Sequence, residues 1–131
     1  MHFAKEMLEA QKILREMGHN VSVPSDVIEC LENPELNMDL EYCMATNIDK
    51  KDFDQVADAD AILVLNYPKN NINGYVGGAT LMEIGLARHL NKKIFILHNL
   101  PSEEEIRYVL EIKVARPIIL QGNIENIKKH L

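Results

Sequence analysis

Hydrophobic side chains near the start of the chain recur at three- and four-residue intervals, with lysine, glutamate and arginine between them. Over residues 5–17 this spacing predicts an amphipathic helix, because positions three and four apart share one face of a helix. Gly18 follows at the place where a left-handed residue ends a helix, and residues 19–23 then read as a short strand stopped by Pro24. The apolar positions of this helix are Met7, Leu8, Ala10, Ile13, Leu14 and Met17.

The middle of the chain changes from helical to strand-like patterning. Residues 25–44 favour helix but are broken at Asn33 and Pro34, and a second, acid-rich helical stretch covers about residues 37–56. Residues 61–65 form an uninterrupted apolar run, which is typical of a strand covered on both faces in a parallel sheet. We therefore expect this strand to be central.

The second half alternates loops, helices and strands. A loop with Pro68, three asparagines and Gly74 leads into a helical pattern. Ser102 offers a helix N-cap, and the three glutamates after it would occupy the first turn, where negative charge suits the helix dipole. The other predicted elements are a helix over residues 79–90, a strand over residues 93–97, a strand over residues 117–120 and a closing helix over residues 123–131.

This order of helices and strands predicts an α/β fold. We expect one domain over residues 1–131, with an open, doubly wound parallel sheet of four strands in a flavodoxin/Rossmann-like three-layer arrangement. Such folds usually begin with a strand that becomes the middle of the sheet, whereas this chain begins with a helix after residues 1–3. Our hypothesis is that the true start lies upstream, or that a rearrangement or a partner chain repairs the sheet.

Composition narrows the classes of protein. The chain has 131 residues, of which 47% are hydrophobic and 26% charged, as in a folded globular protein. A net charge of −6 argues against nucleic acid as a partner, although a small anion held locally stays possible. With no bilayer-spanning run and no secretory signal, we expect no membrane partner and a cytoplasmic location. Cys30 and Cys43 are expected to be reduced, and the histidine and cysteine spacing predicts no metal site.

The chemically richest segment is the loop that leaves the strand at residues 61–65. In open α/β sheets, ligands bind beyond the carboxyl ends of the strands, which is where this loop emerges. Glycines allow a close approach of the backbone to a ligand, and free amides at a helix start attract anions. The glycine spacing matches neither a dinucleotide fingerprint nor a P-loop, and a plain loop before a core helix is the alternative. The residues of interest are Asn66, Tyr67, Tyr75, Gly77, Gly78, Thr80 and Glu83.

A wider pattern adds a family resemblance. Asp52, then Asp60 eight residues later at the start of a strand, then Gly-Gly-Ala-Thr-Leu-Met-Glu-Ile-Gly-Leu-Ala over residues 77–87 resemble the nucleoside 2-deoxyribosyltransferase family, including its deoxynucleoside 5′-monophosphate N-glycosidase relatives. Residues 1–4, Met-His-Phe-Ala, resemble the stretch just after that family's first strand, which this chain then lacks.

The resemblance implies cleavage of the N-glycosidic bond of a (deoxy)nucleoside or its 5′-phosphate, or transfer of the deoxyribosyl group. Glu83 matches the position of the family's nucleophile, and Asp52 matches the acid that assists the departing base; a plain surface acid is the alternative for Asp52. No cofactor is implied, and relatives are oligomers, so a homo-oligomer of two or more subunits is expected. The expected substrate-binding residues are Asn66, Tyr67, Tyr75, Gly77, Gly78, Thr80 and Asp60.

Two other functions stay open. Gly77 stands where the transferases commonly have a further acid, which favours a non-catalytic nucleotide-binding sensor of the same fold. The loop also partly resembles the Gly-Gly-x-Gly-Thr-x-x-Glu motif of cytokinin-activating phosphoribohydrolases, through Gly77, Gly78, Thr80 and Glu83.

Overall fold

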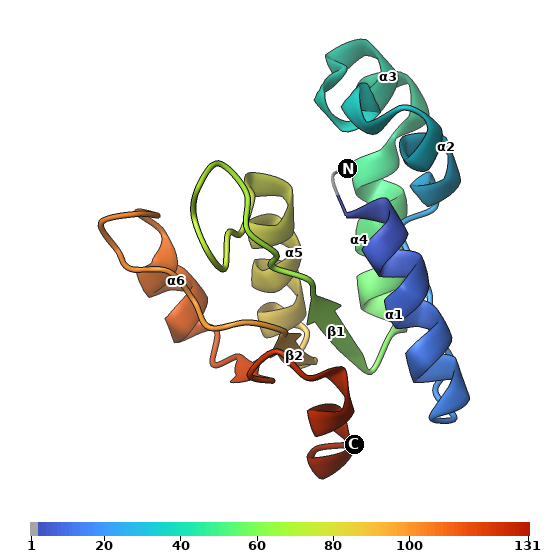
Figure 1. The fold of residues 1–131 in the computed structure, drawn as a ribbon. Helices are drawn as coiled ribbons and strands as arrows, with labels where there is room; N and C mark the ends of the chain where they lie inside the picture. Colours follow the sequence, from blue (N-terminus) through green and yellow to red (C-terminus); the bar gives the residue numbers. More distant parts are fainter. Residues whose placement is uncertain (1–2) are drawn as a thin grey trace. The chain divides into compact units, whose positions relative to one another are not determined.

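The computed structural model describes residues 3–131, and Figure 1 shows its helices and strands. The chain divides into two compact units, unit 1 (Met1–Gln55) and unit 2 (Val56–Leu131). Unit 1 is helical, and unit 2 holds the parallel sheet and its connecting helices. The α/β class predicted from the sequence is therefore confirmed.

Unit 1 begins with the predicted amphipathic helix, α1 (Ala4–Glu16). Gly18 ends it with a φ of 95°. Its amide donates to the Arg15 carbonyl at 3.0 Å, and the His19 amide donates to the Leu14 carbonyl at 3.1 Å. This pair of hydrogen bonds is the Schellman motif, in which a left-handed residue satisfies the last carbonyls of a helix.

The predicted strand at residues 19–23 is wrong: the structure has no strand there. The Val21 carbonyl accepts hydrogen bonds from the side chains of Gln11, at 3.0 Å, and Arg15, at 3.3 Å. A strand requires the backbone of a neighbouring strand, and here side chains of α1 take that place.

The rest of unit 1 consists of short helices, and the helical stretch predicted over about residues 37–56 is helical over residues 40–46 and 48–58. Asn47 interrupts it in the left-handed conformation, with a φ of 51°, which asparagine tolerates better than most residues. Asp39 caps the helix before this break, because its Oδ1 accepts the Tyr42 amide at 3.1 Å. The elements are α2 (Val27–Glu32), the 3-10 helix η1 (Pro34–Met38), α3 (Leu40–Thr46) and α4 (Ile48–Asp58), whose last residues belong to unit 2.

Unit 2 contains an open parallel sheet of three strands, not the four predicted for the chain, because residues 19–23 do not contribute one. The strand order is β1-β2-β3, and Ala61 pairs with Lys93 while Phe95 pairs with Ile118. Within the described residues β2 is therefore central and β1 is an edge strand, which corrects the expectation for residues 61–65. The elements are β1 (Ala61–Val64), α5 (Gly78–His89), β2 (Lys93–Ile96), α6 (Val109–Val114), β3 (Ile118–Ile119) and the 3-10 helix η2 (Ile124–Lys129).

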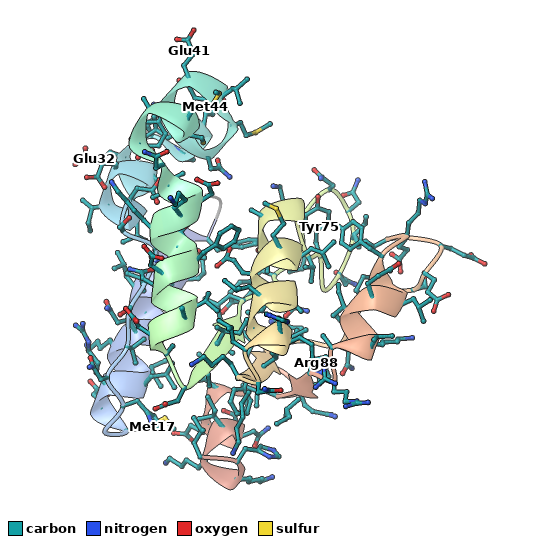
Figure 2. All side chains as sticks on the ribbon, turned by 180° about the vertical axis from the view of Figure 1, so that it is seen from behind. Met17, Glu32, Glu41, Met44, Tyr75 and Arg88 are labelled. Carbon is teal, nitrogen blue, oxygen red and sulfur yellow. The ribbon has the colours of Figure 1, made fainter. Side chains whose placement is uncertain are left out.

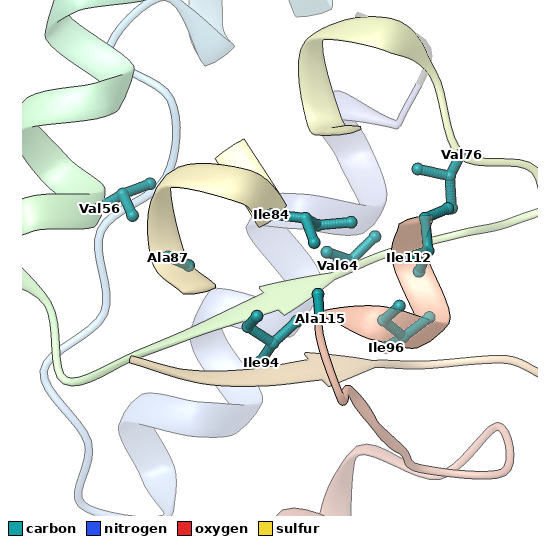
Figure 3. Close-up of a cluster of buried hydrophobic side chains, with 9 residues drawn as sticks. All are labelled: Val56, Val64, Val76, Ile84, Ala87, Ile94, Ile96, Ile112 and Ala115. Carbon is teal, nitrogen blue, oxygen red and sulfur yellow. The ribbon is translucent and has the colours of Figure 1, made fainter. Parts of the chain in front are cut away.

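One face of this sheet carries the hydrophobic core of unit 2 (Figure 3). Helices α5 and α6 both contribute to it, as expected when successive parallel strands are joined by crossovers of one hand. Phe95 lies on the opposite face of β2, because neighbouring residues of a strand point to opposite sides, and its ring is 5.9 Å from that of His130. The core residues are Val56, Val64, Val76, Ile84, Ala87, Ile94, Ile96, Ile112 and Ala115.

Two of the predicted helix starts differ in the structure. Ser102 does form a capping box with Glu105, whose amide donates to Ser102 Oγ at 3.2 Å, but only turns follow and α6 begins at Val109. The closing helix is the 3-10 helix η2, capped by Asn123, which accepts the Glu125 amide at 3.0 Å. Both caps depend on neighbouring residues and can be predicted from the sequence. The length and type of the helix that follows depend on packing.

Candidate functional site

Asn66 ties together the carboxyl ends of β1 and β2. Its Oδ1 accepts the His98 amide at 2.8 Å, and its Nδ2 donates to the His98 carbonyl at 2.9 Å and to the Gly74 carbonyl at 3.4 Å. The side chain is completely buried, with an exposed fraction of 0%. The substrate contact expected for Asn66 stays a prediction, and in the structure its amide group has three backbone partners. It fixes the edge of the sheet from which the glycine-rich loop departs.

Gly74 is the point at which this loop presses against the segment after β2. Its φ is 76°, and a Cβ atom built on it would lie 2.2 Å from the carbonyl oxygen of Asn99. A separation that short is a steric overlap, so only glycine fits without movement of the backbone. Asn66 and Gly74 together hold the loop against the end of the central strand.

Two tyrosines of the loop make aromatic contacts near the carboxyl ends of the strands. Tyr67 packs edge to face against His98, with ring centroids 5.3 Å apart. Lys69 places its ammonium group 5.5 Å from the centroid of the Tyr75 ring. Both tyrosines are half-buried, so each keeps some ring surface that a planar base or a sugar could contact.

The loop ends at the start of α5. Gly77 is the N-cap residue, in an extended conformation with no side-chain cap, and its carbonyl accepts the Leu81 amide at 3.0 Å. Gly78 is the first residue of the helix and Thr80 the third. The first amides of a helix have no partner within the helix, so this entrance is suited to an anionic group.

Glu83 is the sixth residue of α5 and is half-buried. It therefore lies in the second turn, whereas the stabilising effect of the helix dipole falls off within the first turn. Ile84, the next residue, is buried in the core and fixes the rotation of the helix. Glu83 therefore belongs to the helix and not to the loop that precedes it.

Asp60 lies at the other end of β1 from Asn66. It directly precedes the strand, is exposed, and its carbonyl accepts the Lys93 amide at 3.3 Å. Four residues of strand separate the two ends, which corresponds to roughly 13 Å. The structure thus brings together Asn66, Tyr67 and Tyr75 with the start of α5, and it does not bring Asp60 to them.

Asp52 belongs to unit 1, where it lies among other acidic and polar groups. Its Oδ1 is buried and, among the described residues, has no hydrogen-bond partner, as is also true of Asp26 Oδ1. The pKa of Asp52 is raised to about 6, mainly because the carboxyl group is buried and also because Asp26 and Asp49 lie nearby. A hydrogen bond from the Ser25 backbone acts in the opposite direction and lowers the pKa. Asp52 and Glu83 lie in different units, so their pairing in one site stays a prediction.

Asp26 is the centre of this buried cluster, with an exposed fraction of 7%. Its Oδ2 accepts the Tyr42 hydroxyl at 3.1 Å and the Cys30 thiol at 3.5 Å. Burial and then these contacts raise the pKa of Tyr42 to about 12, and burial with Asp26 raises the pKa of Cys30. The raised pKa values keep the Tyr42 hydroxyl and the Cys30 thiol protonated, so both can donate to Asp26 Oδ2.

Replacing Asp52 with asparagine is expected to stabilise the protein at pH 7 by about 1 kcal/mol, after discounting for the partial exposure of the side chain. A pKa raised from 3.8 to about 6 means that protonated Asp52 favours the folded state. This contribution is complete below pH 3.8 and is lost as the pH rises through 6. Urea unfolding at several pH values between 3 and 7 should therefore show a gain that grows with pH.

Asp54→Asn, an exposed position on the same helix, is the matched control and should change stability little at any pH. A gain from Asp52→Asn that is equal at pH 3 and pH 7 would show that the carboxyl group is not desolvated.

Three residues outside the predicted set contact this region. The backbone of His98 is hydrogen-bonded to Asn66, and its ring packs against Tyr67. Lys69 contacts the Tyr75 ring, and the Tyr108 hydroxyl donates to the Val76 carbonyl just before α5. Burial, and secondarily Tyr75, raises the pKa of Tyr108. No local signal marks these residues, because each contact spans distant parts of the chain or a bent loop.

The described part of the chain, residues 3–131, contains no cluster of three or more histidine, cysteine, aspartate or glutamate side chains placed to hold a metal ion. Both cysteines are free, with Cys30 buried and Cys43 half-buried. None of the helices in that part is long and apolar enough to cross a bilayer. Comparison with known proteins gives no further assignment: no family model, no curated protein and no solved structure matches the chain.

Proposed function

We propose that the protein cleaves the N-glycosidic bond of a (deoxy)nucleoside or nucleoside 5′-monophosphate, with Glu83 as the nucleophile, and passes the sugar to water or to a second base. The observation that supports the proposal is the position of Glu83 on α5, a helix with Gly77 as its N-cap and Gly78 as its first residue, which follows a loop held at the carboxyl end of the sheet. This is the end at which open α/β sheets bind ligands.

The proposed chemistry has two balanced steps. A Glu83 carboxylate oxygen bonds to C1′ of the sugar as the bond from C1′ to the base nitrogen breaks, and the base leaves with that electron pair. Asp52, in its acid form, donates a proton to the departing base. Water then attacks C1′, releases the Glu83 carboxylate and returns a proton to Asp52; a second base in place of water completes transfer.

The pKa of Asp52 supports its role in this proposal. A general acid works best when its pKa lies near the working pH, and burial raises that of Asp52 to about 6. The two half-buried tyrosines, Tyr67 and Tyr75, supply aromatic surface for a base or sugar, and the start of α5 supplies amides for a phosphate. We propose further that the sheet is of the doubly wound, flavodoxin/Rossmann-like class and that the site uses no cofactor.

The test is incubation of the purified protein with the deoxynucleosides and their 5′-monophosphates, followed by chromatography of the free bases. We expect release of base from at least one member of the panel, and a second base added to the reaction distinguishes transfer from hydrolysis. No release from any member would refute the enzymatic proposal.

A non-catalytic nucleotide sensor is the second candidate, and the observation that favours it is Gly77, which provides no carboxylate at the helix entrance. The same panel separates the two functions when thermal unfolding is followed in parallel. A nucleotide that raises the unfolding temperature and is recovered intact favours sensing, because binding to the folded state stabilises it by mass action.

A further inference from the structure

The two units differ strongly in charge. Unit 1 has five lysine and arginine residues against twelve aspartate and glutamate residues, a net charge of −7, whereas unit 2 has nine against eight, a net charge of +1. From Glu16 to Asp49 the chain carries eight acidic residues and no lysine or arginine. The excess negative charge of the protein is therefore concentrated on the helices of unit 1.

This acidic region also exposes large apolar side chains. Met38 at the end of η1 is 76% exposed, and Leu40 and Met44, one turn apart on α3, are 72% and 68% exposed. Figure 2 shows Glu41 extending outward from α3, the helix that also carries Met44. Met38 also lines a hollow of about 480 Å³, together with Asn33, Glu35, Leu36 and Asp39. We call this surface of η1 and α3 the acidic face.

Unit 2 exposes a surface of the opposite charge. A hollow of about 340 Å³ is lined by Leu100, Lys113, Arg116, Pro117 and Ile119, with no acidic residue among them. On α6, Leu110 and Val114 lie one turn apart and are 55% and 64% exposed. We call the surface formed by Leu110, Glu111, Lys113, Val114 and Arg116 the basic face, because its two cations outnumber its one exposed acid, Glu111.

We infer that the acidic face of one copy of this chain docks on the basic face of a second copy. Each face combines exposed apolar side chains with a hollow, and exposed apolar groups that lie close together mark interaction surfaces. Glu35 and Asp39 beside one hollow are matched in charge by Lys113 and Arg116 beside the other.

Charge also determines whether two copies associate through the same face or through different faces. Two acidic faces repel each other, so an interface that buries the same face of both copies is disfavoured. A contact between two different faces is heterologous, and it forms a ring or an open chain according to its geometry. This inference concerns surfaces outside the loop and helix of the proposed site, and it holds whether or not Glu83 performs chemistry.

Charge reversal gives the sharpest test. One variant carries Glu35→Lys and Glu41→Lys, which leaves the capping hydrogen bond of Asp39 intact, and the other carries Lys113→Glu and Arg116→Glu. All four side chains are exposed. Sedimentation velocity measures the association of the wild type, each variant and their equimolar mixture, and circular dichroism checks that each variant is folded.

The wild type is expected to self-associate, more weakly at high salt, and each variant alone should associate at least about tenfold more weakly. The mixture should recover association, because reversed faces on the two variants are again opposite in charge. A wild type that stays monomeric at high micromolar concentration overturns the inference, as does a mixture no more associated than its components.

Replacement of one exposed apolar residue tests the apolar contribution to the interface. Met38→Ser should weaken association, while Met82→Ser, at a methionine of α5 that is 55% exposed and lies on neither face, should not. Equal effects of the two substitutions would contradict the assignment of the acidic face.

Discussion

Replacing Glu83 with glutamine is expected to lower the rate of base release by at least about a thousandfold, because the amide lacks the charge that captures a developing oxocarbenium carbon. The side chain keeps its size, so folding and nucleotide binding should be nearly unchanged. Chromatographic rates, the unfolding temperature and nucleotide affinity are measured together, since only the first should fall.

The matched control for this substitution is Glu103→Gln, an exposed acid in the turn after Ser102. It should leave the rate unchanged. A Glu83→Gln protein that releases base at the wild-type rate would remove Glu83 from the chemistry, whereas a protein that loses binding as well would assign it a structural role.

Gly74→Ala is expected to lower the free energy of unfolding of unit 2 by about 3 kcal/mol or more. Two costs combine: the positive φ of 76° is unfavourable for alanine, and the new Cβ would lie 2.2 Å from the Asn99 carbonyl oxygen. Relief of this overlap must move the backbone of the loop or of the segment after β2. Urea unfolding followed by circular dichroism measures the loss.

Gly122→Ala separates these two costs within the same unit. Gly122 has a φ of 82°, but a Cβ there would meet only the His98 ring, at 3.5 Å, which is ordinary contact. This variant should therefore lose about 1–2 kcal/mol, the cost of the left-handed conformation alone. Equal losses for the two variants would mean that the approach of Gly74 to Asn99 is not tight.

Local signals predicted those parts of the fold whose causes are local. The three- and four-residue spacing and Gly18 locate α1 and its end, and the apolar runs locate β1 and β2 to within one residue. The spacing of Leu81, Ile84 and Leu86 similarly identifies α5. In each case the pattern lies within the element itself, and for α1 the ending residue, Gly18, follows directly.

The predictions that were wrong concern segments whose structure depends on residues distant in the sequence. Residues 19–23 have the composition of a strand, but pairing is decided by whether another strand lies alongside, and the Gln11 and Arg15 side chains bind that backbone instead. The break at Asn47 requires a left-handed conformation that asparagine permits and does not demand. Neither result is encoded in a short window of sequence.

The position of the glycine-rich loop was predictable from the sequence, whereas the contacts that hold it were not; the binding site itself stays a prediction. Asn66, Gly74 and Gly77 were recognisable as polar or flexible residues leaving a buried strand. The structural role of Asn66 depends on its hydrogen bonds to the backbone of His98, 32 residues away. The requirement for glycine at position 74 depends on the nearby carbonyl of Asn99. Sequence patterns identify which residues are available, and tertiary contacts decide which of them hold the loop and which face a ligand.

The central claim is that a Glu83 oxygen bonds to the sugar, and mass spectrometry of the protein treated with a reactive 2-fluoroarabinosyl nucleoside tests it most directly. Fluorine beside C1′ slows breakdown of a glycosyl-enzyme, so one sugar should accumulate on the peptide that contains Glu83 and be absent from Glu83→Gln protein. A protein that releases base from the natural substrates yet carries the sugar on a different residue, or carries none at all, would contradict the claim.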